Sequence, residues 1–154
     1  MPIAPINPNV IYAATGEANN SGDSNFGRGI LISTDGGATW TLSTAGGAFD
    51  RRTISEIAID PTNANVAYAA VAGAGVNGVG GISGICKTIN GGSTWTNTTA
   101  SITTTQPYSS VRIDPTTPSA VYAAVGNLFG SAQNGVYRTT NGGTNWSLLS
   151  GAPA

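Results

Sequence analysis

Residues Ser33–Trp40, with the sequence STDGGATW, indicate a repeat architecture because two later segments have nearly the same motif. These are Thr88–Trp95 (TINGGSTW) and Thr139–Trp146 (TTNGGTNW). Their tryptophans are 55 and 51 residues apart, which is close to the length of one β-propeller blade. A motif repeated at this spacing predicts that one small structural unit was copied along the chain.

A second repeated phrase lies upstream of each motif and contains Tyr12, Tyr68 or Tyr122. The tyrosines are 56 and 54 residues apart, so an independent landmark gives nearly the same period. Around two of them lie short runs of small apolar residues, Val66–Val71 and Val121–Val125. We interpret these runs as inner strands packed on both faces, where alanine lets neighbouring sheets approach closely.

Three further strands are predicted in each unit. Apolar residues alternate in Ile54–Ile59 and Ser109–Ile113, as a half-buried strand requires, and an Asp-Pro pair then ends the pattern. A third strand runs into the Gly-Gly pair, and a fourth begins at the tryptophan. Each complete unit is therefore predicted to be a four-stranded antiparallel sheet.

The Gly-Gly turn has a clear physical logic. Asp35, Asn90 or Asn141 stands directly before the glycine pair, where a short polar side chain accepts hydrogen bonds from backbone N–H groups of the turn. Glycine adopts positive φ at little steric cost, and the tryptophan can fold back over the hairpin. We expect three self-capped β-hairpins.

These residues resemble the Asp-box of bacterial neuraminidase repeats (BNR repeats), found in sialidases, sortilin-type propellers and xyloglucan-cleaving glycosidases. The first copy fits fully, whereas the other two carry Asn for Asp and Thr for Ser, and the third has Asn145 where Thr is usual. The resemblance implies a β-propeller, with the Asp-box as a structural corner on the blade periphery, away from the central ligand site. The residues that carry it are Ser33, Asp35, Gly37, Thr39, Trp40, Thr88, Asn90, Gly92, Thr94, Trp95, Thr139, Asn141, Gly143 and Trp146.

The predicted fold is all-β, with three antiparallel four-stranded propeller-type blades at residues 1–50, 51–104 and 105–154. The first blade is expected to lack one strand, because nothing strand-like precedes Ile6. Three blades cannot surround a channel. The expected partners are therefore other blades, either from a homo-oligomer or from the rest of a longer chain, and the start at Met1 inside a blade favours the longer chain.

Composition narrows the function classes. Only 8% of the residues are charged, against about 25% in typical soluble domains, and the net charge is −1. This charge provides no electrostatic footprint for nucleic acid or for an anionic membrane, and no apolar stretch is long enough to span a bilayer, so neither nucleic-acid binding nor membrane insertion is predicted. A makeup rich in Ser, Thr and Asn is common in secreted bacterial proteins, so an extracellular or cell-surface location is expected. With no histidine and a single cysteine, histidine-dependent catalysis and a disulfide within the chain are excluded.

One candidate ligand site lies in the insertion of residues 15–29, between the second and third predicted strands. Its oxygen-bearing side chains are of the type that Ca²⁺ accepts, but their spacing does not match an EF-hand. A solvated loop is the simpler interpretation, and a calcium or glycan contact is the alternative. No other cofactor or metal is predicted. The candidate residues are Glu17, Asn19, Asn20, Asp23 and Asn25.

An enzyme of the glycosidase type would need two carboxylates at a fixed separation. Glu17 together with Asp50 or Glu56 could be nominated, but nothing in the spacing supports such a pair, so no catalytic residue is assigned. The pair Arg51-Arg52 precedes a strand and is expected to be solvated.

The predicted function is therefore a non-catalytic extracellular or cell-surface propeller segment that serves binding, with glycan as one ligand class, or assembly. The alternative is a fragment of a secreted, sialidase- or xyloglucanase-like glycoside hydrolase whose catalytic residues lie elsewhere.

Overall fold

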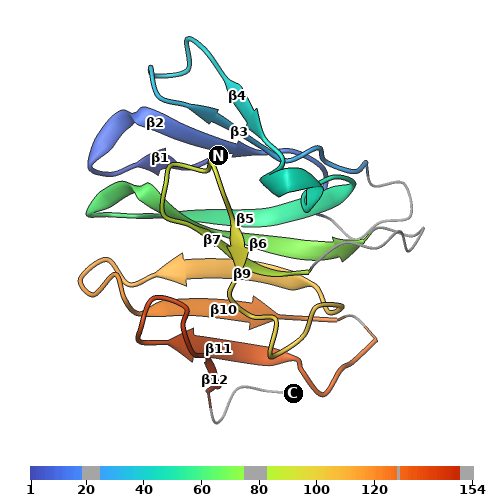
Figure 1. The fold of residues 1–154 in the computed structure, drawn as a ribbon. Helices are drawn as coiled ribbons and strands as arrows, with labels where there is room; N and C mark the ends of the chain where they lie inside the picture. The colour runs from blue at the N-terminus through green and yellow to red at the C-terminus, as the bar shows by residue number, and fades with distance from the viewer. Residues whose placement is uncertain (19–24, 75–82, 128, 150–154) are drawn as a thin grey trace.

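A computed structural model describes residues 1–18, 25–74, 83–127 and 129–149 (Figure 1). Its strands form three separate four-stranded antiparallel sheets, which follow one another in chain order. The described residues also include a short 3₁₀ helix, η1 (Ala45–Gly47), between the first and second sheets. None of the helices in this part of the chain has the length and apolarity needed to span a bilayer.

The strand order within each sheet is sequential. Sheet 1 consists of β1 (Ile3–Ala4), β2 (Asn7–Ala14), β3 (Ile30–Ser33) and β4 (Thr41–Ser43). Sheet 2 consists of β5 (Arg52–Asp60), β6 (Asn63–Ala74), β7 (Gly84–Thr88) and β8 (Thr96–Asn97). Sheet 3 consists of β9 (Tyr108–Ile113), β10 (Val121–Val125), β11 (Gly135–Thr139) and β12 (Ser147–Leu148).

The prediction that the first blade lacks a strand was wrong. The short strand β1 pairs with β2, with Ile3 opposite Ile11, and the Tyr12 N–H donates to the Pro2 carbonyl at 3.1 Å. Two residues between the prolines at 2 and 5 are too few to show the alternation by which a strand is recognised in a sequence. The all-β class and the three four-stranded sheets are confirmed.

The predicted inner strands are the second strands of the three sheets: β2, β6 and β10. Each pairs with the third strand of its sheet in the same register. Tyr12 lies opposite Ile32, Tyr68 opposite Lys87, and Tyr122 opposite Arg138. Because the register is repeated, equivalent side chains point to equivalent faces of each sheet.

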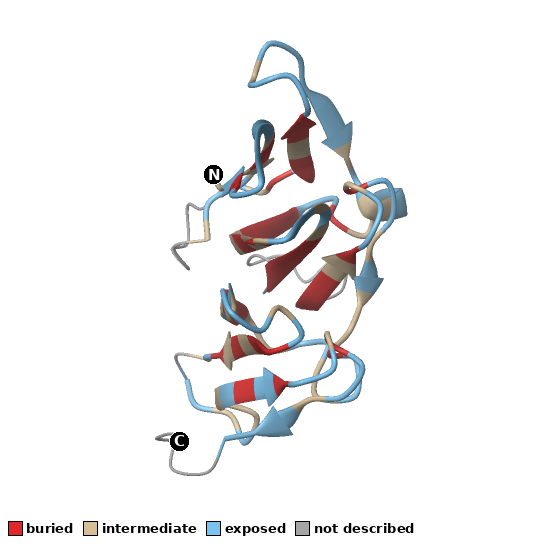
Figure 2. Ribbon diagram, turned by 90° about the vertical axis from the view of Figure 1, so that its left-hand side faces the viewer, coloured by how far each residue is buried: buried red, intermediate tan, exposed pale blue. Residues whose placement is uncertain are grey.

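Two buried apolar clusters fill the interfaces between neighbouring sheets. The first lies between sheets 1 and 2, the second between sheets 2 and 3, and Figure 2 shows sheet 2 as the most extensively buried. Strand β6 contributes Ala69 to the first cluster and Ala70 to the second, which confirms that it is packed on both faces. In β10 only alternate residues are buried, and Tyr122 is half-buried, because just one of its faces meets another sheet.

The connections separate to two edges of the molecule. The ends of β2, β6 and β10 lie at one edge, at the right of Figure 1. The Gly-Gly turns, which join β3 to β4, β7 to β8 and β11 to β12, lie at the opposite edge. The described residues between β2 and β3, which include the candidate ligand residues Glu17 and Asn25, thus belong to the edge opposite the Gly-Gly turns.

Candidate functional site

The first Gly-Gly turn, here called corner 1 (Ser33–Trp40), is closed by a hydrogen-bond network. The Ser33 hydroxyl donates to the Asp35 carboxylate at 2.7 Å and accepts from the Gly37 N–H at 2.8 Å. The Thr39 hydroxyl and N–H donate to the same carboxylate at 2.6 and 2.9 Å, and the Trp40 indole donates to the Gly37 carbonyl at 3.0 Å. These bonds, those of Thr39 foremost, lower the pKa of Asp35 to about 2.

Corner 2 (Thr88–Trp95) repeats this network with an amide in place of the carboxylate. Asn90 Oδ1 accepts from the Thr88 hydroxyl at 3.0 Å and from the Thr94 N–H at 2.9 Å. The Asn90 amide also donates to the Thr94 hydroxyl at 2.8 Å, and the Trp95 indole donates to the Gly92 carbonyl at 3.1 Å. Asparagine keeps the acceptor that the turn needs, so the Asp-to-Asn change preserves the corner.

Corner 3 (Thr139–Trp146) is closed in the same way except at its tryptophan. Asn141 Oδ1 accepts from the Thr139 hydroxyl at 2.8 Å and from the Asn145 N–H at 2.9 Å. The buried Trp146 indole nitrogen has no hydrogen-bond partner among the described residues.

Sheet 1 covers corner 2. The Ser43 hydroxyl donates to the Gly92 carbonyl at 2.5 Å and accepts from the Trp95 indole at 3.1 Å. The rings of Tyr12 and Phe49 meet the Trp95 ring edge to face, at centroid distances of 6.5 and 5.5 Å. The indole of corner 2 is therefore part of the contact between two sheets.

Sheet 2 covers corner 3 through a pair of cross-strand neighbours. The Tyr68 hydroxyl and the Lys87 ammonium both donate to the Gly142 carbonyl, at 3.0 and 2.7 Å. The ammonium also lies 5.3 Å from the centroid of the Tyr68 ring, a cation–π arrangement. A tyrosine of the preceding sheet thus contacts the following corner at both junctions.

The first strands of sheets 2 and 3 are joined by Glu56 of β5. Its carboxylate accepts from the Ser110 hydroxyl at 2.6 Å and the Val111 N–H at 3.0 Å, and it forms an ion pair with Arg112. Glu56 was one of the nominated catalytic carboxylates, and the structure shows it in a contact between sheets instead. A carboxylate within an alternating strand gives no sequence signal for this role.

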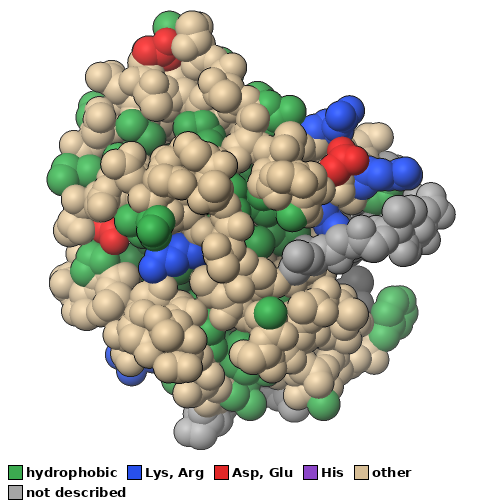
Figure 3. Space-filling view, viewed as in Figure 1, with side chains coloured by type: hydrophobic (Ala, Val, Ile, Leu, Met, Phe, Trp, Pro, Cys, Tyr) green, Lys and Arg blue, Asp and Glu red, His purple; other side chains and the backbone are tan. Residues whose placement is uncertain are grey.

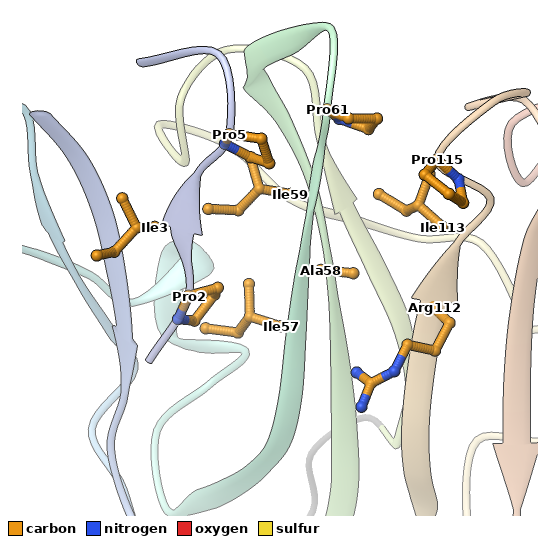
Figure 4. Close-up of a pocket in the computed structure, with 10 residues that line it drawn as sticks. All are labelled: Pro2, Ile3, Pro5, Ile57, Ala58, Ile59, Pro61, Arg112, Ile113 and Pro115. Carbon is orange, nitrogen blue, oxygen red and sulfur yellow. The ribbon is translucent and has the colours of Figure 1, made fainter. Parts of the chain in front are cut away.

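A groove of about 270 Å³ runs along the first strands of the three sheets (Figure 4). Its walls are built from isoleucines and prolines, and Arg112 supplies its charged group. The lining includes neither a carboxylate nor an aromatic ring, which glycan hydrolysis and sugar stacking would require. The lining residues are Pro2, Ile3, Pro5, Ile57, Ala58, Ile59, Pro61, Arg112, Ile113 and Pro115.

The candidate ligand residues lie only partly within the described residues. Glu17 and Asn25 are exposed and bond each other, with the Asn25 N–H donating to the Glu17 carboxylate at 3.1 Å. Asn19, Asn20 and Asp23 lie outside the described residues. In the part of the chain that the structure describes, no three acidic, histidine or cysteine side chains are grouped to hold a metal. The calcium or glycan contact remains a prediction.

The same connection is tied to the start of sheet 2. Gly27 pairs with Arg52, whose carbonyl accepts from the Gly27 N–H at 2.9 Å. Close by, Arg28 forms an exposed ion pair with Asp50 at 3.0 Å, and Arg51 lies over the Phe26 ring. Figure 3 shows acidic and basic side chains side by side at this edge.

Arg52 contradicts the expectation that the Arg51-Arg52 pair is solvated. Arg51 is exposed, but Arg52 is only 2% exposed, and burial lowers its pKa. It begins β5, and its backbone pairs with Gly27 of the connection between β2 and β3, a contact that is not visible in the local sequence.

The carboxylates considered for catalysis are engaged by different groups: Glu17 by its own loop, Asp50 by Arg28, and Glu56 by β9. The described residues therefore form contacts that hold and join sheets, and they assemble no acid and base across a cleft.

Comparison with known proteins identifies the relatives of this chain, although no family model matches it. A xyloglucanase of Hypocrea jecorina (strain QM6a) is 31% identical over 93% of this chain and 19% of its own length. A xyloglucanase of Paenibacillus sp. is 27% identical, over 97% and 16% respectively. The GH74 enzyme of Niastella koreensis superimposes with a TM-score of 0.67 at 26% identity, over 97% of this chain and 22% of its own.

This chain therefore spans about a fifth of the length of these relatives. The relationship supports the glycoside-hydrolase alternative better than the non-catalytic binding segment that we favoured from the sequence. The chain is homologous over nearly its whole length to GH74 xyloglucanases, which are BNR/Asp-box β-propeller enzymes, and its three sheets are a segment of such a propeller.

Proposed function

We propose that this chain is a three-blade segment of a secreted xyloglucan-cleaving glycoside hydrolase. In this proposal it forms part of the propeller wall, and the catalytic carboxylates lie outside it. The observation that carries the proposal is the homology to xyloglucanases over nearly the whole chain together with the shared fold.

The positions of the acidic residues support a structural role for the segment. Asp35 closes corner 1, and Asp60 and Asp114 accept from the N–H groups of the turns that follow them, both at 2.8 Å. Glu56 joins sheets 2 and 3. Because these carboxylates hold the fold, the acid and base of glycoside hydrolysis would come from other parts of the enzyme.

The edge that carries the β2–β3 and β10–β11 connections is the proposed side for substrate contact. Phe129, in the second of these connections, is 97% exposed, so its ring is free to stack on a sugar. Two other aromatic residues outside the repeated sequence phrases, Phe49 and Tyr108, are buried and belong to the core. The Glu17 and Asn25 side chains at the same edge are exposed and could bind sugar hydroxyls.

The proposed partners are the other blades of the same propeller. This follows from the share of each relative that the chain covers, and from the open faces of sheets 1 and 3.

A chimeric enzyme tests the proposal. This chain would replace the aligned segment of the Hypocrea jecorina xyloglucanase, and reducing ends released from xyloglucan would be measured. We expect the folded chimera to hydrolyse xyloglucan, whereas the 154-residue chain alone should not. A chimera that is folded by circular dichroism yet inactive, or an isolated chain that cleaves xyloglucan, would contradict the proposal.

Within the chimera, Phe129→Ala should raise KM for xyloglucan severalfold and leave kcat within about twofold, because a stacking contact contributes equally to substrate and transition-state binding. Ile89→Ala is the matched control, since Ile89 is 69% exposed but lies in corner 2 at the opposite edge. An equal KM change in both variants would remove Phe129 from the substrate site.

A further inference from the structure

The connection between β10 and β11 holds an exposed aromatic ring on a firmly attached backbone. Phe129 is 97% exposed, the highest fraction among the large apolar side chains of the described residues. A single exposed apolar side chain is common on protein surfaces, so this exposure alone indicates no function. The hydrogen bonds that fix the chain next to the ring distinguish Phe129 from the other exposed apolar residues.

Asn127 lies at the centre of these hydrogen bonds. Its side-chain oxygen accepts from the Phe129 N–H at 2.9 Å, and its side-chain amide donates to Gln106 Oε1 at 2.7 Å. Its backbone N–H donates to Asn134 Oδ1 at 2.9 Å, and its carbonyl accepts from the Asn134 amide at 3.2 Å and from the Gly130 N–H at 3.0 Å. The backbone and the side chain of Asn127 are therefore both fixed.

The same bonds attach this connection to the neighbouring parts of the sheet. The glutamine that accepts from Asn127 belongs to the segment that leads into β9, where the Pro107 carbonyl accepts from the Gly126 N–H at 3.2 Å. After the ring, the buried Tyr137 of β11 donates its hydroxyl to the Gln133 carbonyl at 3.1 Å. The chain is thus held both before and after the ring, while the ring itself lies in solvent.

A fixed backbone improves the affinity of a ring that stacks on a sugar. Stacking needs the ring at a defined place, and a loop that is ordered only at the moment of binding weakens the affinity. An aromatic side chain has only two torsions, so little conformational entropy remains to be lost once its backbone is held. The hydrogen bonds around Asn127 therefore prepare Phe129 for a ligand.

We propose that Asn127 is a positioning residue for sugar binding, and that it acts through Phe129, whose ring stacks on a pyranose ring of the bound polysaccharide. The proposal rests on the function proposed above, because that function places this edge on the substrate side of a xyloglucan-cleaving enzyme. Asn127 itself does not need to contact the substrate.

Steady-state kinetics of the chimeric enzyme on xyloglucan test this role. Asn127→Ala should raise KM severalfold, as Phe129→Ala does, and leave kcat within about twofold. Asn127→Asp should keep KM within about twofold of the unmodified chimera, because a carboxylate still accepts from the Phe129 N–H and the Gln106 amide can turn to donate to it. Gln106→Ala removes only one of the bonds, so it should raise KM by a smaller factor, and it replaces Asn127→Ala if that variant does not fold.

Asn63→Ala is the matched control. Asn63 forms the same type of local bond, since its side-chain oxygen accepts from the Asn65 N–H at 3.0 Å. It begins β6, however, and so lies at the opposite edge of the molecule. This variant should leave KM for xyloglucan unchanged.

A double variant separates positioning from an independent contribution to binding. If Asn127 acts only through the ring, then Asn127→Ala should raise KM no further when Phe129 is already alanine. Circular dichroism shows whether each variant is folded.

Two results in an active chimera would overturn this inference and leave the proposed function intact. One is a folded Asn127→Ala variant with unchanged KM, and the other is a KM that rises independently with the two substitutions. A folded chimera that does not hydrolyse xyloglucan would instead contradict the proposed function, and this inference with it.

Discussion

Corners 1 and 2 have almost the same internal hydrogen bonds but very different surroundings. In both, the residue before the glycine pair accepts from a hydroxyl and a backbone N–H, and the indole donates to the second glycine carbonyl. Trp40 is 39% exposed, whereas Trp95 lies against Tyr12 of sheet 1 and against Phe49, which follows η1 in the connection to sheet 2. The corner is thus a local structure, and its burial depends on the sheet before it.

This difference is the expected behaviour of a repeat protein, in which stability comes from each repeat and from its contacts with its neighbours. The same substitution should therefore cost more at corner 2, where a neighbour covers the turn, than at corner 1.

Removing the indole should give the largest difference. Trp95→Ala should reduce the free energy of unfolding by about 2–4 kcal/mol, because it removes a partly buried ring that packs against Tyr12 and Phe49. Trp40→Ala removes a partly exposed ring and should cost only about 1–2 kcal/mol. Urea unfolding followed by circular dichroism measures both, and equal losses would show that sheet 1 does not cover corner 2.

The next largest difference in stability between corners 1 and 2 is expected when a methyl group is added at the second glycine of each turn. Gly37 and Gly92 both have positive φ, 95° and 85°, so alanine costs about 1–2 kcal/mol at either position. At Gly92 the new methyl would also collide with the side chain of Ile32, which adds about 1–3 kcal/mol. Midpoints of urea unfolding for the two alanine variants would give the difference, and a Gly37→Ala loss as large as that of Gly92→Ala would count against the packing described here.

A smaller effect is expected from the hydroxyl that links the sheets. Ser43→Ala removes the donor to the Gly92 carbonyl and should lower the free energy of unfolding by about 1 kcal/mol. Thr41→Ala, an exposed position in the same strand, serves as the control and should change it less. Thermal unfolding of both variants measures the difference, and identical shifts would remove Ser43 from the junction.

The smallest expected effect is the loss of stability at low pH that comes from the Asp35 carboxylate. The folded pKa of Asp35 is lowered from 3.8 to about 2, so its stabilising contribution is complete above about pH 4 and is lost as pH falls toward 2. Asp35→Asn should be nearly neutral at pH 7, as corners 2 and 3 already use asparagine, and should weaken the pH dependence between 4 and 2. Thermal unfolding at a series of pH values checks this, and an unchanged acid profile would rule out Asp35 as the titrating group.

Local features of the fold were predictable from the sequence, and contacts between sheets were not. The Gly-Gly turns, the strands around Tyr68 and the ends of strands at Asp-Pro follow from nearby residues, and the structure confirms them. The two-residue strand β1 has no pattern of its own and exists through its pairing with β2.

The same limit applies to the candidate site. The burial of Arg52 and the role of Glu56 depend on residues about 25 and 54 positions away, Gly27 and Ser110, so their local sequence could not reveal them. The Asp-box motif predicted its own hydrogen bonds but not which corner a neighbouring sheet would cover. The choice between binding segment and hydrolase fragment required the comparison with xyloglucanases.

Hydroxyl-radical footprinting of the three tryptophans, read by mass spectrometry in dilute solution, tests the stacking of the sheets most directly. Trp40 should be oxidised faster than Trp95, because Trp40 is 39% exposed whereas Trp95 is partly buried against Tyr12 and Phe49. Equal oxidation rates for Trp40 and Trp95 in the folded chain would contradict a row of sheets in which each covers the corner of the next.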